Sequence, residues 1–177
     1  MPHRKAPETL IAIGRLTKPH GLRGELVFLP YVADLALVPE LRERTVVLRR
    51  GEEPPQGRRV AGWRRFGRRA LIRLEACEDR TQAEGFRNYE VLVPRAWFPP
   101  LAEGEYYWFE IEGLAVYAPG GKYMGKVVEI IATGSNDVYV VRRGRREVLV
   151  PALKQVVRRV DLARGEMHLA VREEDLT

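Results

Sequence analysis

The chain has 177 residues, 45% of them hydrophobic and 31% charged, which excludes disorder over the whole length and allows one domain or two small ones. No apolar run approaches the roughly 20 residues that span a bilayer, and the apolar run near the N-terminus is shorter than the ~7–15 residues of a signal-peptide core. The single cysteine, Cys77, cannot form an internal disulfide. We therefore expect a cytoplasmic protein in which Cys77 is a core residue.

Positive charge is concentrated in the first half of the chain. The net charge is +6, and residues 1–100 hold 19 Lys and Arg against 12 Asp and Glu. Residues 49–73 hold nine arginines and two glutamates, which favours an acidic polymer such as RNA as the partner. Arginine outnumbers lysine 25 to 5, so a solvated arginine-rich surface is the alternative. The candidate RNA-contacting residues are Arg49, Arg50, Arg58, Arg59, Arg64, Arg65, Arg68 and Arg69.

Short runs rich in Val, Ile, Leu and aromatic residues, separated by Gly, Pro and charged turns, predict strands along the first half. The expected strands cover residues 9–16, 25–30, 45–50, 58–65, 69–74 and 90–93. Gly67 suits the turn of a hairpin between the fourth and fifth of these. Asp79 can cap one short helix, expected near residues 80–87. The pattern predicts a small β-barrel.

A proline-rich segment interrupts the strand pattern at residues 93–105, where three prolines and a glycine mark a linker. We expect a first domain over residues 1–94, a linker over 95–104 and a second domain over 105–177. Trp97 and Phe98 are large for a free linker, so we expect them to dock on a domain surface or between the domains.

The second half is again rich in short strands. We expect them at residues 107–111, 115–117, 122–131, 137–142, 147–151, 156–161 and 166–171, with Gly144 at a hairpin tip. This number of strands in so short a segment suggests a second small barrel, followed by a polar and flexible C-terminal tail. The fold class is therefore mainly β, with two small barrels.

Four consecutive aromatic residues begin the second domain: Tyr106, Tyr107, Trp108 and Phe109. If they lie in a strand they alternate between its two faces, so one pair can fill a core while the other is exposed or packs on the neighbouring domain. Exposed Tyr and Trp are typical anchors for protein or RNA. The alternative is that all four pack within the two-domain body.

The segment GRLTKPHGLRGELVFLP, residues 14–30, resembles neither a P-loop nor a dinucleotide-binding fingerprint, and a strand rather than a helix follows it. We interpret it as a connection between two strands, with Gly21 and Gly24 supplying backbone angles that other residues resist.

No orienting carboxylate is evident for His20, and one cysteine with scattered histidines does not suggest a metal site. The sequence therefore predicts no catalytic, cofactor or metal site. An enzyme built on His20 is the alternative hypothesis.

Several separated motifs, in order, carry a resemblance that covers nearly the whole chain. They are IGRLTKPHGLRGELVFLP, CEDRTQAEGFRNYEVLVPR, GEYYWFEIEGLAVYAPGGKYMGKVVEI, GSNDVYVV and VLVPALKQVVRRVDL. Together they resemble the ribosome maturation factor RimM family. The matching positions are Gly14, His20, Gly21, Gly24, Glu25, Asp79, Arg80, Ala83, Glu84 and Arg87. One departure is Asn88, where glycine is expected after Arg87, in a turn.

The resemblance implies a first barrel similar to those of translation factors and a second of the PRC type. It implies an assembly factor for the head of the small (30S) ribosomal subunit, acting in 16S rRNA processing without being the nuclease. The implied partners are the nineteenth small-subunit protein and nearby 16S rRNA, with a monomeric chain, no cofactor, no small-molecule substrate and no membrane. The candidate partner-binding residues are Tyr106, Tyr107, Trp108, His20, Lys18 and Arg23. The main alternative is a general RNA-binding barrel without a ribosomal role.

Overall fold

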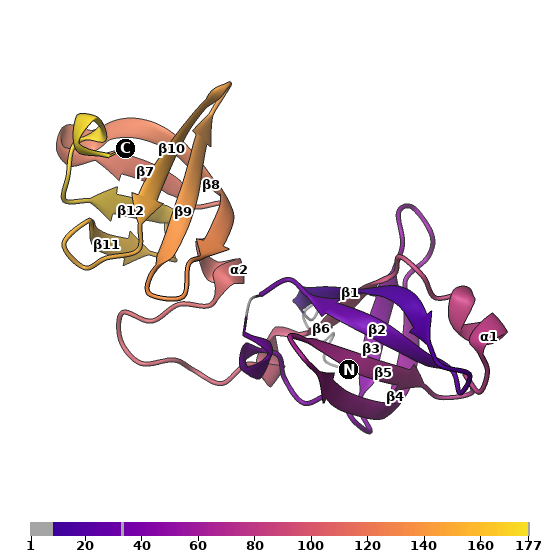
Figure 1. Cartoon of the computed structure of the whole chain (residues 1–177). Helices are drawn as coiled ribbons and strands as arrows, with labels where there is room; N and C mark the ends of the chain where they lie inside the picture. The colour runs from indigo at the N-terminus through magenta and orange to yellow at the C-terminus, as the bar shows by residue number, and fades with distance from the viewer. Residues whose placement is uncertain (1–8, 33, 177) are drawn as a thin grey trace, which may run out of the picture. The chain divides into compact units, whose positions relative to one another are not determined.

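The computed structural model describes residues 9–32 and 34–176 (Figure 1). The chain divides into two compact units, Met1–Pro99 and Pro100–Thr177. This division falls inside the linker expected at residues 95–104. Each unit contains its own β-sheet, in agreement with a mainly β fold of two domains.

The first unit is a closed barrel in which all strand pairs are antiparallel and neighbours follow the order β1-β2-β5-β4-β3-β6. The strands are β1 (Leu10–His20), β2 (Glu25–Pro30), β3 (Thr45–Arg49), β4 (Gln56–Phe66), β5 (Arg69–Leu74) and β6 (Glu90–Pro94). The helices are the 3-10 turns η1 (Leu35–Leu37) and η2 (Arg95–Trp97) and the α-helix α1 (Arg80–Glu84). Closure removes the exposed edges of the sheet.

Large apolar side chains from alternating positions fill this barrel. Phe28 on β2 and Trp63 on β4 meet edge to face, with ring centroids 5.1 Å apart, and Leu26 on β2 pairs with Ile72 on β5. Gly14 leaves the room that the Phe28 ring needs, since a Cβ at Gly14 would lie 2.4 Å from the Phe28 Cζ atom. The interior is therefore a packed core.

Strand β1 is longer than predicted and continues to His20. Its pairing with β2 shifts register between Leu16 and Pro19, so an irregularity precedes the proline. Such a bulge accommodates a residue that cannot donate a backbone hydrogen bond, which is why Pro19 does not end the strand. The predicted helix is shorter than expected because it ends at Gly85, while the Asp79 carboxylate caps it by accepting from the Gln82 amide at 2.8 Å.

The start of the expected linker packs on the first unit. The Arg95 amide donates to the Thr9 carbonyl at 2.8 Å, and the Arg44 guanidinium carbon lies 4.7 Å above the centre of the Trp97 ring. Phe98 is buried. Trp97 thus docks on a domain surface, one of the two placements expected from its size.

The second unit is a six-stranded sheet in the order β10-β9-β8-β7-β12-β11, where β7 and β12 are parallel and the other described pairs are antiparallel. The strands are β7 (Ala115–Ala118), β8 (Lys122–Ala132), β9 (Asp137–Arg143), β10 (Arg146–Pro151), β11 (Val157–Asp161) and β12 (Glu166–Leu169). The helical segments are α2 (Trp108–Ile111), η3 (Pro119–Gly121) and η4 (Glu173–Asp175). Buried side chains such as Val116, Val141 and Met167 form its core. In the described residues, β10 and β11 are the sheet edges, so pairing does not close this unit as it closes the first.

The strand predicted at residues 107–111 is wrong, because this segment forms helix α2. The Glu110 carboxylate accepts a hydrogen bond from the Tyr107 amide at 3.0 Å and caps the helix from its first turn. This local capping overrides the strand preference of four aromatic residues. The aromatic side chains therefore do not alternate between two sheet faces. The Tyr107 and Phe109 rings stack instead, with centroids 5.2 Å apart.

Candidate functional site

The glycine–histidine segment is a tight connection between β1 and β2, as the sequence predicts. Gly21 and Gly24 have positive φ angles of 64° and 74°. Position 24 also demands glycine for space, since a Cβ there would lie 2.1 Å from the Cys77 carbonyl oxygen. Cys77 is buried, and burial is the main cause that raises the pKa of its thiol. The turn is thus packed against the segment that follows β5.

Two arginines of the second motif hold this turn from the side of α1. Arg87 Nε donates to the Thr17 carbonyl of β1 at 3.1 Å, and Arg80 Nη1 donates to the Gly21 carbonyl at 3.5 Å. Asn88 has a positive φ of 65°, the conformation that glycine adopts most easily. This conformation explains why glycine is expected after Arg87. Arg80 and Arg87 therefore link the segment around α1 to the glycine–histidine turn and to β1.

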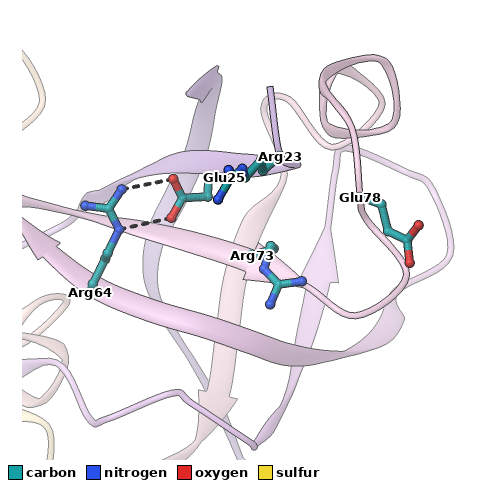
Figure 2. Close-up of a pocket in the computed structure, with 5 residues that line it drawn as sticks. All are labelled: Arg23, Glu25, Arg64, Arg73 and Glu78. Atoms are coloured by element: carbon teal, nitrogen blue, oxygen red, sulfur yellow. Dashed lines mark hydrogen bonds and ion pairs between the residues drawn. The ribbon is translucent and has the colours of Figure 1, made fainter. Parts of the chain in front are cut away.

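An open pocket of about 650 Å³ lies beside the turn. Charged side chains from the turn, from three strands and from the segment after β5 line it: Arg23, Glu25, Arg64, Arg73 and Glu78 (Figure 2). We call it the barrel pocket. Two of its residues, Arg23 and Arg64, are among the predicted contact residues. Arg73 and Glu78 were not among the named candidate residues, although Arg73 ends the arginine-rich segment, because strand pairing and the Gly24–Cys77 contact bring them to the turn.

An ion pair occupies one part of the barrel pocket, and Arg23, Arg73 and the carboxylate of Glu78 line the rest. Arg64 donates to both carboxylate oxygens of Glu25, at 3.0 Å from Nε and 2.9 Å from Nη2, across the intervening strand β5 (Figure 2). The hydrogen bond from Arg64 is the main cause that lowers the pKa of Glu25, against the opposing effect of burial. Neither Arg23 nor Arg73 has an ion pair within the described residues, so both stay available to an anion.

His20 is the last residue of β1 and lies beside this pocket. Its backbone pairs with Glu25, and its ring lies 5.0 Å from the Phe66 ring, centroid to centroid, with the two planes tilted by 59°. Phe66 is the last residue of β4 and is 44% exposed. His20 is therefore one half of a surface aromatic pair. Lys18, also on β1, is exposed.

Most of the other predicted RNA-contacting arginines have partners within the first unit. Arg49 pairs with Glu90, Arg50 with Glu53 and Arg59 with Glu43. The Arg58 guanidinium carbon lies 5.7 Å above the Phe86 ring, and Arg65 Nε donates to the Gly67 carbonyl at 3.2 Å. Arg68 and Arg69 are exposed at the β4–β5 hairpin. The arginine-rich segment is therefore partly neutralised, by Glu53 within the segment and by Glu43 and Glu90, which are distant in sequence.

A second pocket, of about 320 Å³, lies in the second unit and is mainly aromatic and aliphatic. Its larger lining residues are Tyr106, Tyr139, Leu153, Val157 and Val160, together with the basic residues Lys154, Arg158 and Arg159. We call it the tyrosine pocket. Burial is the main cause that raises the pKa of Tyr139. Of the predicted partner-binding aromatic residues, Tyr106 lines this pocket, Tyr107 is buried and Trp108 is half-buried.

No helix in the described part of the chain is long and apolar enough to cross a membrane. Within residues 9–32 and 34–176, no group of three or more His, Cys, Asp or Glu side chains is arranged to hold a metal ion.

The fold and these sites define a two-domain β protein with a basic pocket on a closed barrel and a tyrosine-lined pocket on a second sheet domain. A family model described as the RimM N-terminal domain matches residues 11–98, and one described as the RimM PRC barrel domain matches residues 108–175. The chain belongs to the RimM family.

Two similar proteins agree with this assignment, and one solved structure is also similar to the chain. A protein of Azotobacter vinelandii named ribosome maturation factor RimM is 42% identical over 165 residues, which cover 90% of this chain and 91% of the relative. A protein of the same name from Thermotoga neapolitana is 37% identical over 163 residues, covering 92% and 91%. A crystal structure has been solved of a 16S ribosomal RNA processing protein RimM from Pseudomonas aeruginosa. Its sequence is 31% identical to this one, and the match covers 94% of this chain and 99% of that chain with a TM-score of 0.47.

Proposed function

We propose that this protein is a ribosome maturation factor that assists late assembly of the small-subunit head and processing of 16S rRNA in the cytoplasm. One observation carries the proposal: both RimM domains are present, in order, in one chain. The role is non-catalytic, because it requires the protein to bind an assembly intermediate rather than to convert a substrate. It needs no cofactor, and the chain acts as a monomer.

The two pockets suggest which partner each domain binds. The tyrosine pocket combines aromatic and aliphatic surface with three basic residues, which suits a protein partner. We assign it to the nineteenth small-subunit protein, with Tyr106 as the member of the tyrosine pair that lines the pocket. The barrel pocket, with Arg23 and Arg73, suits the 16S rRNA nearby.

Such a factor promotes assembly only through a difference in affinity. It must bind the correctly arranged protein–RNA head of an immature subunit more tightly than it binds misarranged states. Release follows when the mature head offers a poorer surface. Because this mechanism depends on binding alone, it predicts that loss of binding and loss of maturation accompany each other in every variant.

Co-sedimentation with immature small subunits tests the proposal. The Tyr106→Ala/Tyr107→Ala variant, shown to fold by circular dichroism, should co-sediment less than the wild type. Leu162→Ala is the matched control, since Leu162 is an exposed apolar residue of the same unit, and it should co-sediment normally. If the wild type does not bind immature subunits at all, the proposed function is wrong.

A general RNA-binding module is the second candidate, favoured by the basic barrel pocket. Pull-down from a lysate followed by mass spectrometry and RNA sequencing separates the two functions. Recovery of the nineteenth small-subunit protein with 16S rRNA supports the assembly factor. Recovery of diverse RNAs without that protein supports the general module.

A further inference from the structure

We propose that the barrel surface around the glycine–histidine turn is a binding site for unpaired RNA, in which one base stacks on Phe66 and an adjacent phosphate lies between Arg23 and Arg73. The inference rests on the proposed function, because that function supplies the RNA. It adds Phe66, which no motif singled out, and it gives a specific role to Arg73, the last arginine of the arginine-rich segment.

Phe66 provides the stacking surface. An isolated exposed phenylalanine needs no explanation, but this ring lies among cations and against an imidazole. Its cross-strand partner on β5 is Arg69, and the ring of His20 lies 5.0 Å away. The His20 ring supports Phe66 from one direction and leaves 44% of the residue exposed. Stacking of a base on an aromatic ring is worth about 1–3 kcal/mol and accepts any base.

Arg73 provides a cation that the barrel holds in place. Its neighbour on β4 is Gly62, and a Cβ at that position would lie 3.3 Å from the Arg73 Cβ and 3.7 Å from its Nε. Because Gly62 has no side chain, the Arg73 side chain has room to lie across β4. Arg23 comes from the turn, which the Gly24–Cys77 contact fixes against the barrel.

The Glu25–Arg64 pair connects the two parts of the site. Glu25 pairs along the sheet with His20 on one side and with Arg73 on the other. Arg64 neutralises the Glu25 carboxylate and lies two residues before Phe66 on β4. The stacking ring and the phosphate-binding cations thus lie on either side of one neutral pair. A nucleotide, whose base and phosphate are joined through a sugar, has groups that match both sides.

The chemistry of the surface favours single-stranded RNA over two other partners. An RNA duplex hides its base faces, so it would leave Phe66 unused. An acidic peptide would engage Arg23 and Arg73 but has no requirement for an aromatic ring. Only an unpaired strand uses the ring and the cations together.

Fluorescence anisotropy with a labelled oligouridine of about ten nucleotides tests the site, over KCl from about 50 to 200 mM. Phe66→Leu keeps an apolar side chain but removes the π face, and should weaken binding about tenfold, while Phe66→Trp should retain it. Arg23→Gln and Arg73→Gln should each lower the slope of log K against log salt by about 0.7. Arg49→Gln is the matched control, since Glu90 already neutralises Arg49, and it should leave the slope unchanged.

Three outcomes overturn the inference: wild-type affinity in Phe66→Leu, tighter binding of a duplex of the same length, or equal competition by oligoglutamate, which would assign the surface to an acidic peptide. Urea unfolding of each variant confirms that the barrel is intact. Co-sedimentation of the same variants with immature small subunits separates this inference from the proposed function. Subunit binding without oligouridine binding rejects only the RNA site.

Discussion

Gly24 lies against the backbone of Cys77 so closely that any side chain at position 24 would collide with the Cys77 carbonyl group. The two residues are 53 positions apart in the sequence, and the Cys77 thiol lies 3.4 Å from the Gly24 carbonyl oxygen. Their contact fixes the glycine–histidine turn on the barrel. It thereby places Arg23 of the turn and Glu78, the neighbour of Cys77, on the same pocket.

Gly24→Ala should destabilise the protein by about 3–5 kcal/mol, because it adds both a steric collision and an unfavourable positive φ. Gly21→Ala is the matched control, since Gly21 also has a positive φ but nothing lies within 4 Å of a Cβ there. It should cost only about 1–2 kcal/mol. Urea denaturation measures both values, and equal costs would show that the Cys77 contact is unimportant.

Cys77 should be nearly inert toward a thiol reagent in the folded protein. It is 1% exposed, and burial, with a smaller contribution from Asp79, raises the pKa of its thiol. Both effects reduce the thiolate that reacts. Following the reaction with a chromogenic disulfide, we expect slow modification in buffer and fast modification in urea. Fast modification without denaturant would contradict the packing of this segment.

Tyr31 should stay neutral until strongly alkaline pH. Burial, the hydrogen bond from its hydroxyl to Glu90 and the charge of Glu90 raise the pKa of Tyr31 to about 12. Because the folded pKa exceeds the unfolded value of about 10, its contribution to stability is complete below pH 10 and is lost as the pH rises toward 12.

The difference in phenolate absorbance between wild type and Tyr31→Phe measures this titration. Urea unfolding of the two proteins from about pH 9 to 12 should show a steeper loss of stability in the wild type. A transition near pH 10 in the absorbance difference, as in a free peptide, would mean that the Tyr31–Glu90 bond does not persist.

The two tyrosines of the pair should respond differently to substitution. Tyr107 is 5% exposed, so Tyr107→Ala should lower stability by about 3 kcal/mol. Tyr106 is half-buried and lines the tyrosine pocket, so Tyr106→Ala should cost about 1 kcal/mol while weakening binding to immature subunits. Tyr106→Phe keeps the ring and serves as the control. Normal subunit binding by a folded Tyr106→Ala protein would remove Tyr106 from the interface.

The arginines between residues 49 and 73 should not contribute equally to RNA binding. Arg68→Gln/Arg69→Gln should lower the salt slope by about 1.4, since these exposed hairpin residues have no carboxylate partner within the described residues. Arg49→Gln/Arg59→Gln should change it little, because Glu90 and Glu43 already compensate these charges. Salt titration of oligouridine binding compares the two double variants. Equal slopes would indicate that the surface binds RNA through net charge alone.

Local sequence patterns predict most of the strands and the turns between them. The strands at 25–30 and 69–74 begin and end where predicted, because Gly24 and Gly67 adopt the positive φ angles expected of turn glycines. The cap at Asp79 was also predictable, since its carboxylate accepts from a backbone amide only three residues ahead. These features depend on local alternation and local hydrogen bonds. Helix α2 was missed although its signal, a glutamate three residues after the N-cap, is present at Glu110.

Which charges and aromatic rings are free to bind depends on tertiary packing within each unit. Arg64 looks like any other arginine of its segment until strand pairing brings Glu25, 39 residues away, within hydrogen-bond distance. Likewise Phe66 meets His20, and Tyr106 rather than Tyr107 reaches a pocket, through packing that no local pattern encodes. The physical reason is that charge compensation and burial act through space. They depend on the register of strands that are distant in the chain, whereas the strands themselves depend on their neighbours in sequence.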